Sequence, residues 1–254
     1  QEFIDEMKGK ITNSMQYNDT MSFTKMSKNI LEDKYAKNYG NVYQKGALIG
    51  MALDILLREE SKGKYGVRNL MMDLSKKFGQ NKPFKDDEIL DQIVAMTYPA
   101  IGTFFDNHLT GNVPINYEAL LQKVGITKET KTIDASYFLD SNSQIFLSVN
   151  NKQEIFFTKR KNTALEALGV KAGDILKSIN GTDINLQNIR TFIGQSFQWK
   201  EGDAITFEII RNGNVVKLEG DFIKGKTEVE DLIIEDLPDT NPKKKLREAW
   251  LKAL

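Results

Sequence analysis

The sequence contains no cysteine and a single histidine, His108. Without cysteine the chain can form no disulfide, no thiolate zinc site and no cysteine nucleophile. One imidazole excludes a two-histidine zinc site within this chain, and a Ser-His-Asp triad could use only His108. Because His108 has no partner ligands at a useful spacing, we expect no metal among the site residues of this chain.

Positive and negative charges balance, with 35 Lys and Arg against 35 Asp and Glu. Nucleic-acid binding favours a basic excess that pairs with phosphates, so we expect no nucleic-acid partner. No apolar run approaches the ~18 residues of a membrane-spanning helix, and we expect no such segment. The chain begins at Gln1 without a signal peptide, as a processed product or a fragment would. The compartment stays open, with a periplasmic or secreted location slightly preferred to the cytoplasm.

Apolar residues at helical spacing fill the first half of the chain, which predicts an all-α region over residues 1–128. Residues 47–57 are apolar on nearly all sides, which is typical of a central buried helix. Asp54 is the only charge in that segment, and we expect it to pair with Arg58, four residues later. We expect Gly79 to end the helix that begins near Val67.

A second helical pattern in this region carries Ile89, Ile93 and Met96, and we expect Asp86 to cap it. The acidic residues 86–88 are favoured at a helix start by the helix dipole, and this interpretation needs no metal. The dipeptide Tyr98-Pro99 then breaks the helix.

The pattern changes after about Lys131, where short β-rich runs alternate with turn residues. We predict a small β-domain over residues 129–225 that holds two helices. Residues 226–254 follow as an acidic tail that ends in a short amphipathic helix. The predicted strands and helices of the β-domain are the strands 145–149, 155–158, 174–179, 205–209 and 216–222 and the helices 164–168 and 186–194.

Residues 168–181, Leu-Gly-Val-Lys-Ala-Gly-Asp-Ile-Leu-Lys-Ser-Ile-Asn-Gly, resemble the signature of PDZ domains. The resemblance implies a PDZ-like β-barrel with two helices, in which a peptide adds a strand beside residues 145–149. The second side of the groove is then the helix 186–194. The groove residues implied are Ile145, Phe146, Leu147, Leu186, Ile189 and Arg190.

The loop that holds a peptide carboxylate in PDZ domains is replaced here by residues 140–144, Asp-Ser-Asn-Ser-Gln. The negative charge of Asp140 opposes capture of a carboxylate. Two roles therefore stay open for this domain, a working peptide groove and a packing or positioning module.

Residues 41–54 carry a second resemblance, because Tyr43-Gln44-Lys45-Gly46-Ala47 is similar to the Tyr-x-Lys-Gly-Ala segment of gluzincin aminopeptidases. The similarity is greatest to the glycyl aminopeptidase family, whose members carry a PDZ domain downstream. It implies an α+β fold with two domains, a C-terminal helical subdomain of a thermolysin/aminopeptidase-like catalytic unit and then the PDZ-like domain. Further segments match this family in the same order, namely residues 70–79, 82–88, 97–99 and 246–251.

The resemblance implies a zinc-dependent aminopeptidase that removes small residues such as Gly and Ala from peptide N-termini. That family holds zinc with a His-Glu-x-x-His helix and a downstream Glu, and this sequence contains no His-Glu pair. We therefore expect the metal helix upstream of Gln1, in an N-terminal metal-binding part of the same protein. The chain alone is then inactive and carries no cofactor, and peptide substrate and the N-terminal part are its partners. The alternative is a non-catalytic PDZ scaffold that binds peptides.

Tyr43 matches the tyrosine that donates a hydrogen bond to the tetrahedral intermediate in the related aminopeptidases. A phenol with a pKa of ~10 is neutral at pH 7 and can donate to an oxyanion. The competing interpretation is a tyrosine that packs at a helix start with its hydroxyl in water. We expect Tyr39 to be a packing residue and Lys45 to be a surface lysine that extends its ammonium group into water.

Overall fold

The computed structural model describes residues 2–252, whose backbone forms two compact units. The helical unit comprises described residues 2–128 and 232–252, and the sheet unit comprises residues 129–231. The helical unit therefore includes the described residues 232–252 as well as the first part of the chain. The predicted domain limits at 128 and 225 stay predictions.

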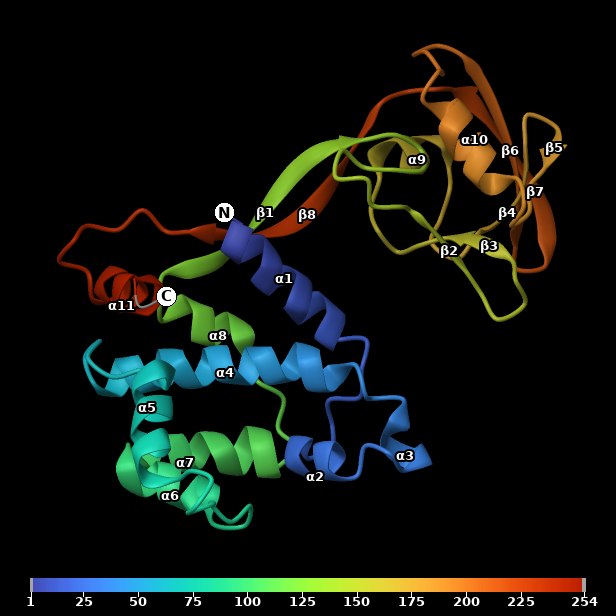
Figure 1. The fold of residues 1–254 in the computed structure, drawn as a ribbon. Helices are drawn as coiled ribbons and strands as arrows, with labels where there is room; N and C mark the ends of the chain where they lie inside the picture. Colours follow the sequence, from blue (N-terminus) through green and yellow to red (C-terminus); the bar gives the residue numbers. More distant parts are fainter. Residues whose placement is uncertain (1, 253–254) are drawn as a thin grey trace. The chain divides into compact units, whose positions relative to one another are not determined.

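The helical unit is built from ten helical segments within the described residues (Figure 1). They are α1 (Glu2–Ser14), α2 (Phe23–Lys28), α3 (Asp33–Ala36), α4 (Asn41–Glu60), α5 (Val67–Lys77), α6 (Ile89–Met96), α7 (Pro99–Phe105), the π-helix η1 (Asp106–Thr110), α8 (Tyr117–Gln122) and α11 (Pro242–Leu251).

The long helix α4 is the centre of this unit, and α1, α5, α7 and α11 all pack against it. Its residues Leu48, Ala52 and Ile55 are almost fully buried on one face, and Leu57 is fully buried on the opposite side. This confirms the central helix predicted from residues 47–57. Asp54 accepts a hydrogen bond from Arg58 Nε at 2.9 Å, as predicted, and also one from the backbone N–H of Val67. Asp54 therefore joins α4 to the start of α5.

Two helix ends differ from the prediction. The helix α5 ends at Lys77 because Phe78 adopts an extended conformation, so Gly79 does not form the stop and instead pairs with Lys82. The helix α6 begins at Ile89 after a turn, with Glu88 rather than Asp86 at the cap position. The break at Pro99 is confirmed, since Pro99 is the first residue of α7.

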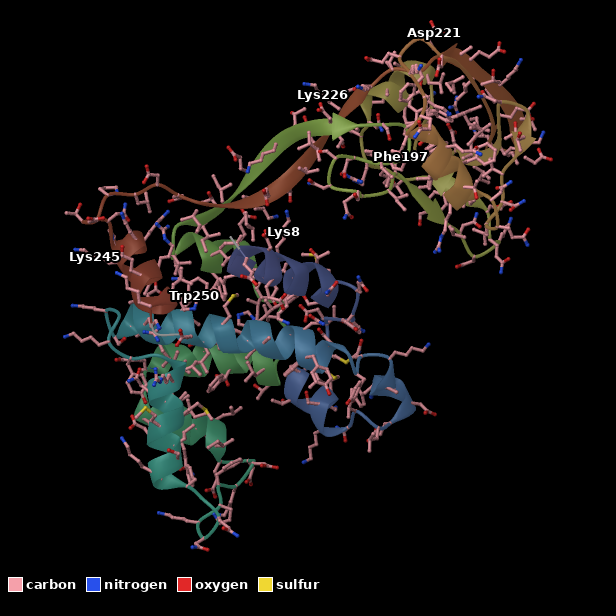
Figure 2. All side chains as sticks on the ribbon, turned by 45° about the horizontal axis from the view of Figure 1, so that its top comes forward. Lys8, Phe197, Asp221, Lys226, Lys245 and Trp250 are labelled. Carbon is pink, nitrogen blue, oxygen red and sulfur yellow. The ribbon has the colours of Figure 1, made fainter. Side chains whose placement is uncertain are left out.

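The C-terminal helix α11 is fixed to the helical unit by the guanidinium group of Arg247. Its Nη1 donates to the carbonyl oxygens of Val124 and Gly125, and its Nη2 donates to that of Glu235. Trp250 packs edge-on against Phe3 of α1, with ring centroids 5.2 Å apart (Figure 2). These contacts give α11 a defined position beside α4.

The sheet unit contains a sheet with the strand order β2-β3-β4-β6-β7, with β5 paired to β4. The prediction of a mixed helix and sheet fold is confirmed, but among the described residues this sheet is open and does not close into the predicted barrel. The elements are β2 (Leu147–Val149), β3 (Ile155–Phe157), α9 (Thr163–Leu168), β4 (Ile175–Ile179), β5 (Thr182–Asp183), α10 (Ile189–Ser196), β6 (Ala204–Arg211) and β7 (Asn214–Asp221).

Aromatic rings form the core of the sheet unit. Phe207 lies nearly parallel to Phe138 and to Phe157, with centroids 6.0 Å apart in each pair. Tyr137 and Trp199 meet edge to face at 6.4 Å. Ring pairs of this kind add to the free energy of burying the rings.

The predicted turn residues adopt the conformations that their chemistry favours. Asn180 and Gly181 both have positive φ and connect β4 to β5. Asn212 and Gly213 do the same between β6 and β7, which pair along their whole length. The carboxylate of Asp174 accepts from the backbone N–H of Lys171 and also receives two hydrogen bonds from Arg211.

Two further strands, β1 (Ile126–Ala135) and β8 (Gly225–Ile234), pair with each other in a two-stranded sheet. We expected an acidic tail from Lys226, and residues 226–234 instead belong to the strand β8. The reason is its alternation, in which Thr227 is buried while Glu228 and Glu230 are exposed. Within the described residues, no helix is both long enough and apolar enough to cross a membrane.

Candidate functional site

Tyr43 lies in the first turn of α4 and is 62% exposed. Tyr39, four residues earlier, is 53% exposed, so it is not the packing residue that we expected. The two hydroxyl oxygens are 3.1 Å apart, and the rings meet edge to face with centroids at 5.7 Å. Two phenols are therefore paired on one open surface at the start of the central helix.

The pairing changes the acidity of Tyr43. The hydrogen bond with Tyr39 raises the pKa of Tyr43 above its ordinary value of 10.0, and the charge of an ionised Tyr39 and burial act in the same direction. Tyr43 therefore remains a neutral hydrogen-bond donor throughout the neutral and mildly alkaline range. This is the protonation state that the role suggested by the resemblance requires.

Lys45 lies two residues after Tyr43 and contacts the interior of the helical unit. It is 3% exposed and forms an ion pair with Asp19, and its ammonium lies 6.0 Å from the ring centroid of Phe23. Our expectation of a surface lysine was wrong, because α4 turns this residue inward onto the 15–22 segment. The pair ties that segment to the helix that carries Tyr43.

Close packing continues at Gly40, one residue before α4 begins. A Cβ atom at this position would collide with the hydroxyl oxygen of Tyr17. Asn41 is 2% exposed, and its Oδ1 has no hydrogen-bond partner among the described residues. The exposed tyrosines therefore stand on a tightly packed base that contains one unsatisfied acceptor.

The residues of this chain do not fit the zinc centre that the resemblance implies for the intact protein. Among residues 2–252 there is no cluster of three or more His, Cys, Asp or Glu side chains that could hold a metal. The Nδ1 atom of His108 lies 2.7 Å from the carbonyl oxygen of Val113, and its ring packs near Phe104 at 5.2 Å. These contacts give His108 a structural role, and the location of the zinc stays a prediction.

The groove residues implied by the PDZ resemblance lie in different environments. Strand β2 is at the edge of its sheet and begins at Leu147, which is partly buried against the core. Ile145 precedes the strand, is 47% exposed and pairs with Leu139 in an isolated bridge. Phe146 is a core residue with 1% exposure, so its side chain cannot line a groove. The guanidinium of Arg160 lies 4.5 Å from the Phe146 ring centroid.

On the other predicted side of the groove, α10 starts later than expected. Leu186 is 43% exposed and precedes the helix, which begins at Ile189. Ile189 is partly buried against the core, while Arg190 is exposed. Their assignment as peptide contacts stays a prediction.

The loop at 140–144 is occupied by its own carboxylate. Asp140 accepts hydrogen bonds from the backbone N–H groups of Asn142 and Gln144, both at 2.9 Å, and forms an ion pair with Arg160. Burial by itself would raise the pKa of Asp140, but the hydrogen bonds from Gln144 and Arg160 together lower it. Because these donors are already used, the loop has little left to offer a peptide carboxylate.

Comparison with known proteins gives structural similarities alone. No protein-family model matches this chain, and no curated protein matches it. The chain is similar to the crystal structure of an aminopeptidase N family protein from Idiomarina loihiensis, at 20% identity, over 92% of this chain and 41% of that one, with a TM-score of 0.47. It is also similar to the PDZ domain of EpsC from Vibrio cholerae, at 17% identity, over 30% of this chain and 75% of that one, with a TM-score of 0.25. The chain spans less than half of the length of the first structure.

Sequence reasoning singled out Tyr43 but missed what surrounds it. The spacing of Tyr39 and Tyr43 by four residues indicated that their side chains share one face, and Tyr39 lies two residues before α4 begins. Asp19 lies in an irregular segment 26 residues before Lys45 and left no pattern that could have revealed the pairing.

Proposed function

We propose that this chain is part of a peptidase and that Tyr43 donates a hydrogen bond to the oxyanion formed when a peptide bond is attacked. The observation that carries the proposal is the exposed, neutral phenol of Tyr43 at the start of the buried helix α4. A donor that is already oriented costs no reorganisation as charge develops on the substrate.

Rigidity supports this role. Lys45 and Asp19 fix the first turns of α4 from one side, and Leu48 and Ala52 anchor the helix in the core. Groups on packed helices hold their positions better than groups on loops. Tyr39 is the positioning residue, since its hydroxyl lies within hydrogen-bond distance of that of Tyr43.

The remaining parts of the reaction are assigned to the intact protein. In this proposal zinc would be held by an N-terminal metal-binding part of the same protein, where it would supply Lewis-acid chemistry. The substrates are peptides with a small N-terminal residue, Gly or Ala. This chain contributes the phenol and one side of the cleft, and it is inactive alone.

The test is to express the complete protein and to compare wild type with Tyr43→Phe on Gly and Ala p-nitroanilides. We expect kcat to fall about 10²- to 10³-fold with a small change in KM, as for loss of one oxyanion donor. Tyr98→Phe is the control, because Tyr98 lies near Tyr65, past the other end of α4. Unchanged kcat in Tyr43→Phe would reject the role of Tyr43, and absence of hydrolysis by the wild-type protein would reject the peptidase.

A second candidate function, peptide binding by the sheet unit, is favoured by the edge strand β2. Ile145 and Val149 beside this edge are 47% and 49% exposed, and an extended peptide could pair with the strand. Since Asp140 occupies the nearby amides, we propose that internal segments bind as well as free C-termini.

Titration with labelled peptides that end in a carboxylate or a carboxamide tests this second function. Equal saturable binding of both forms, weakened by Ile145→Lys and Leu186→Asp, is the expected result. Preference for the carboxylate would contradict the role given to Asp140, and no binding by either form leaves the unit as a packing module.

A further inference from the structure

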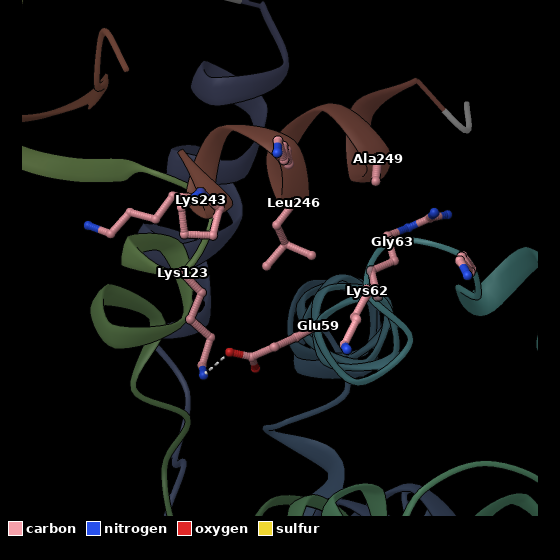
Figure 3. Close-up of a pocket in the computed structure, with 11 residues that line it drawn as sticks. Glu59, Lys62, Gly63, Lys123, Lys243, Leu246 and Ala249 are labelled. Atoms are coloured by element: carbon pink, nitrogen blue, oxygen red, sulfur yellow. Dashed lines mark hydrogen bonds and ion pairs between the residues drawn. The ribbon is translucent and has the colours of Figure 1, made fainter. Parts of the chain in front are cut away.

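A cavity of about 570 Å³ opens in the helical unit between the C-terminal end of α4, the following turn, α8 and α11 (Figure 3). It lies far from the tyrosine pair. Tyr43 and Glu59 are 16 residues apart on α4, which corresponds to roughly 24 Å along a helix that rises ~1.5 Å per residue. We call it the α4–α11 cavity. Neither the peptidase proposal nor the PDZ-like groove uses it.

The charge around the α4–α11 cavity is strongly positive. Lys62, Lys64 and Lys245 line it and form no ion pair with any described residue. Lys123 also lines it and pairs with Glu59 at 2.7 Å, and Glu59 is the one acidic side chain among the described residues that line the space. Several cations around one opening, with one neutralised acid, make an environment that favours an anion.

One wall of the cavity is apolar. Figure 3 shows Leu246 extending from α11 into the space between α4 and Lys123, with the Lys123–Glu59 pair beyond it. Ala249 lies on the same side of α11, and a Cβ atom on Gly63 would be 3.0 Å from the Cβ of Ala249. The cavity therefore combines an apolar wall with a cationic rim.

The helices and the turn that form the cavity are held in place by specific contacts. Arg247 joins α11 to the carbonyl groups after α8, and Gly63 takes the positive φ that lets the turn after α4 approach α11. The cavity does not depend on a mobile segment for its shape.

We propose that the α4–α11 cavity binds a small organic anion with an apolar body and a carboxylate head. The apolar body contacts Leu246 and Ala249, and the carboxylate lies among Lys62, Lys64 and Lys245. The volume is within the range of small-molecule sites, roughly 300–1,000 Å³. An uncharged or cationic ligand of the same size lacks the electrostatic attraction.

The experiment titrates the chain with octanoate and with octylammonium while the methyl signals of Leu246 and Ala249 are followed by NMR. We expect octanoate to shift both signals saturably and to bind at least about tenfold more tightly than octylammonium, with an affinity that falls as salt rises. Equal binding of the two ligands, or octanoate binding that leaves these methyl groups unaffected, would overturn the proposal.

A second experiment reverses the charge of two lysines at the α4–α11 cavity. The double variant Lys62→Glu, Lys245→Glu changes exposed side chains without ion-pair partners, so the fold is retained, and octanoate affinity should fall about tenfold or more. The matched control is Lys159→Glu, Lys171→Glu, which reverses two charges around a different hollow in the sheet unit. Equal loss in both double variants would show a general charge effect and would reject the site.

Discussion

The hydroxyl oxygens of Tyr39 and Tyr43 lie 3.1 Å apart at the exposed start of α4. One phenol can donate to the other, so one proton of the pair remains available to an external acceptor. The hydrogen bond also raises the pKa of Tyr43, and the charge of an ionised Tyr39 acts in the same direction. The pair thus couples the position of a donor to its protonation state.

Replacement of Tyr39 by Phe should lower the pKa of Tyr43 toward its ordinary value of 10.0, since the cause of the increase is removed. Titration of tyrosine ¹³Cζ signals measures this shift, with Tyr43 assigned from its absence in Tyr43→Phe. Tyr98→Phe serves as the control and should leave the titration of Tyr43 as it is. An unchanged pKa of Tyr43 in Tyr39→Phe would contradict the pairing.

Local signals in the sequence predicted much of the fold, because they act over a few residues. The apolar run at 47–57, Pro99 and the pair Asn180-Gly181 each produced the element that its chemistry favours. The pairing of β1 with β8 joins strands about a hundred residues apart, and no local pattern encodes it.

The candidate site likewise contains features that local sequence predicts and features that depend on distant parts of the chain. Tyr43 could be named from a short motif, whereas the burial of Lys45 depends on Asp19 in a distant irregular segment. Phe146 lies in a β-rich run, but which of its neighbours faces the core depends on how the strand packs. The cations of the α4–α11 cavity come from three separate stretches of chain, so their proximity is a property of the fold.

The ion pair of Lys45 and Asp19 should be asymmetric in its effect on stability. Asp19→Asn leaves a lysine that is 3% exposed without its partner, and we expect a loss of about 3 kcal/mol or more in the free energy of unfolding. Lys45→Met leaves an aspartate that is 30% exposed, and the loss should be smaller, at ~1–2 kcal/mol.

Urea denaturation of both single variants and the double variant gives the coupling energy of this pair. Lys10→Met is the control, because Lys10 forms an exposed ion pair with Glu6 at 3.1 Å. Such pairs contribute ~0.5 kcal/mol or less. Equal, small effects at both pairs would show that Lys45 is not buried as described.

Asp140 should make the stability of the sheet unit depend on pH. Its pKa is lowered in the folded protein, so its contribution is present above the unfolded value of ~3.9 and is lost as the pH falls through the folded pKa. The difference in free energy of unfolding between wild type and Asp140→Asn should therefore shrink as the pH falls from about 5 to about 2.5.

Fluorescence of Trp199 in a Trp250→Phe background reports this unfolding in the sheet unit, which contains Trp199. Asp134→Asn, at an exposed position nearby in sequence, should produce no comparable pH-dependent difference. A difference for Asp140→Asn that grows on acidification would contradict the hydrogen-bonded carboxylate.

Arg247 links the stability of the helical unit to the α4–α11 cavity. Its guanidinium donates to three backbone carbonyl groups, at Val124, Gly125 and Glu235, and it is 8% exposed. A lysine presents one compact ammonium in place of the planar fork and cannot reproduce this geometry. Carbonyl groups that lose their donor in a buried position cost ~1–3 kcal/mol each. Arg247→Lys should therefore lower the free energy of unfolding by at least about 1 kcal/mol, measured by urea denaturation with Trp250 as the reporter in a Trp199→Phe background.

Because α11 carries Leu246 and Ala249, the same variant should weaken octanoate binding even where the protein remains folded. Lys252→Met, which breaks an exposed pair with Glu248 on the same helix, should change neither quantity. Loss of stability with unchanged octanoate binding would show that the ligand is held by groups outside α11.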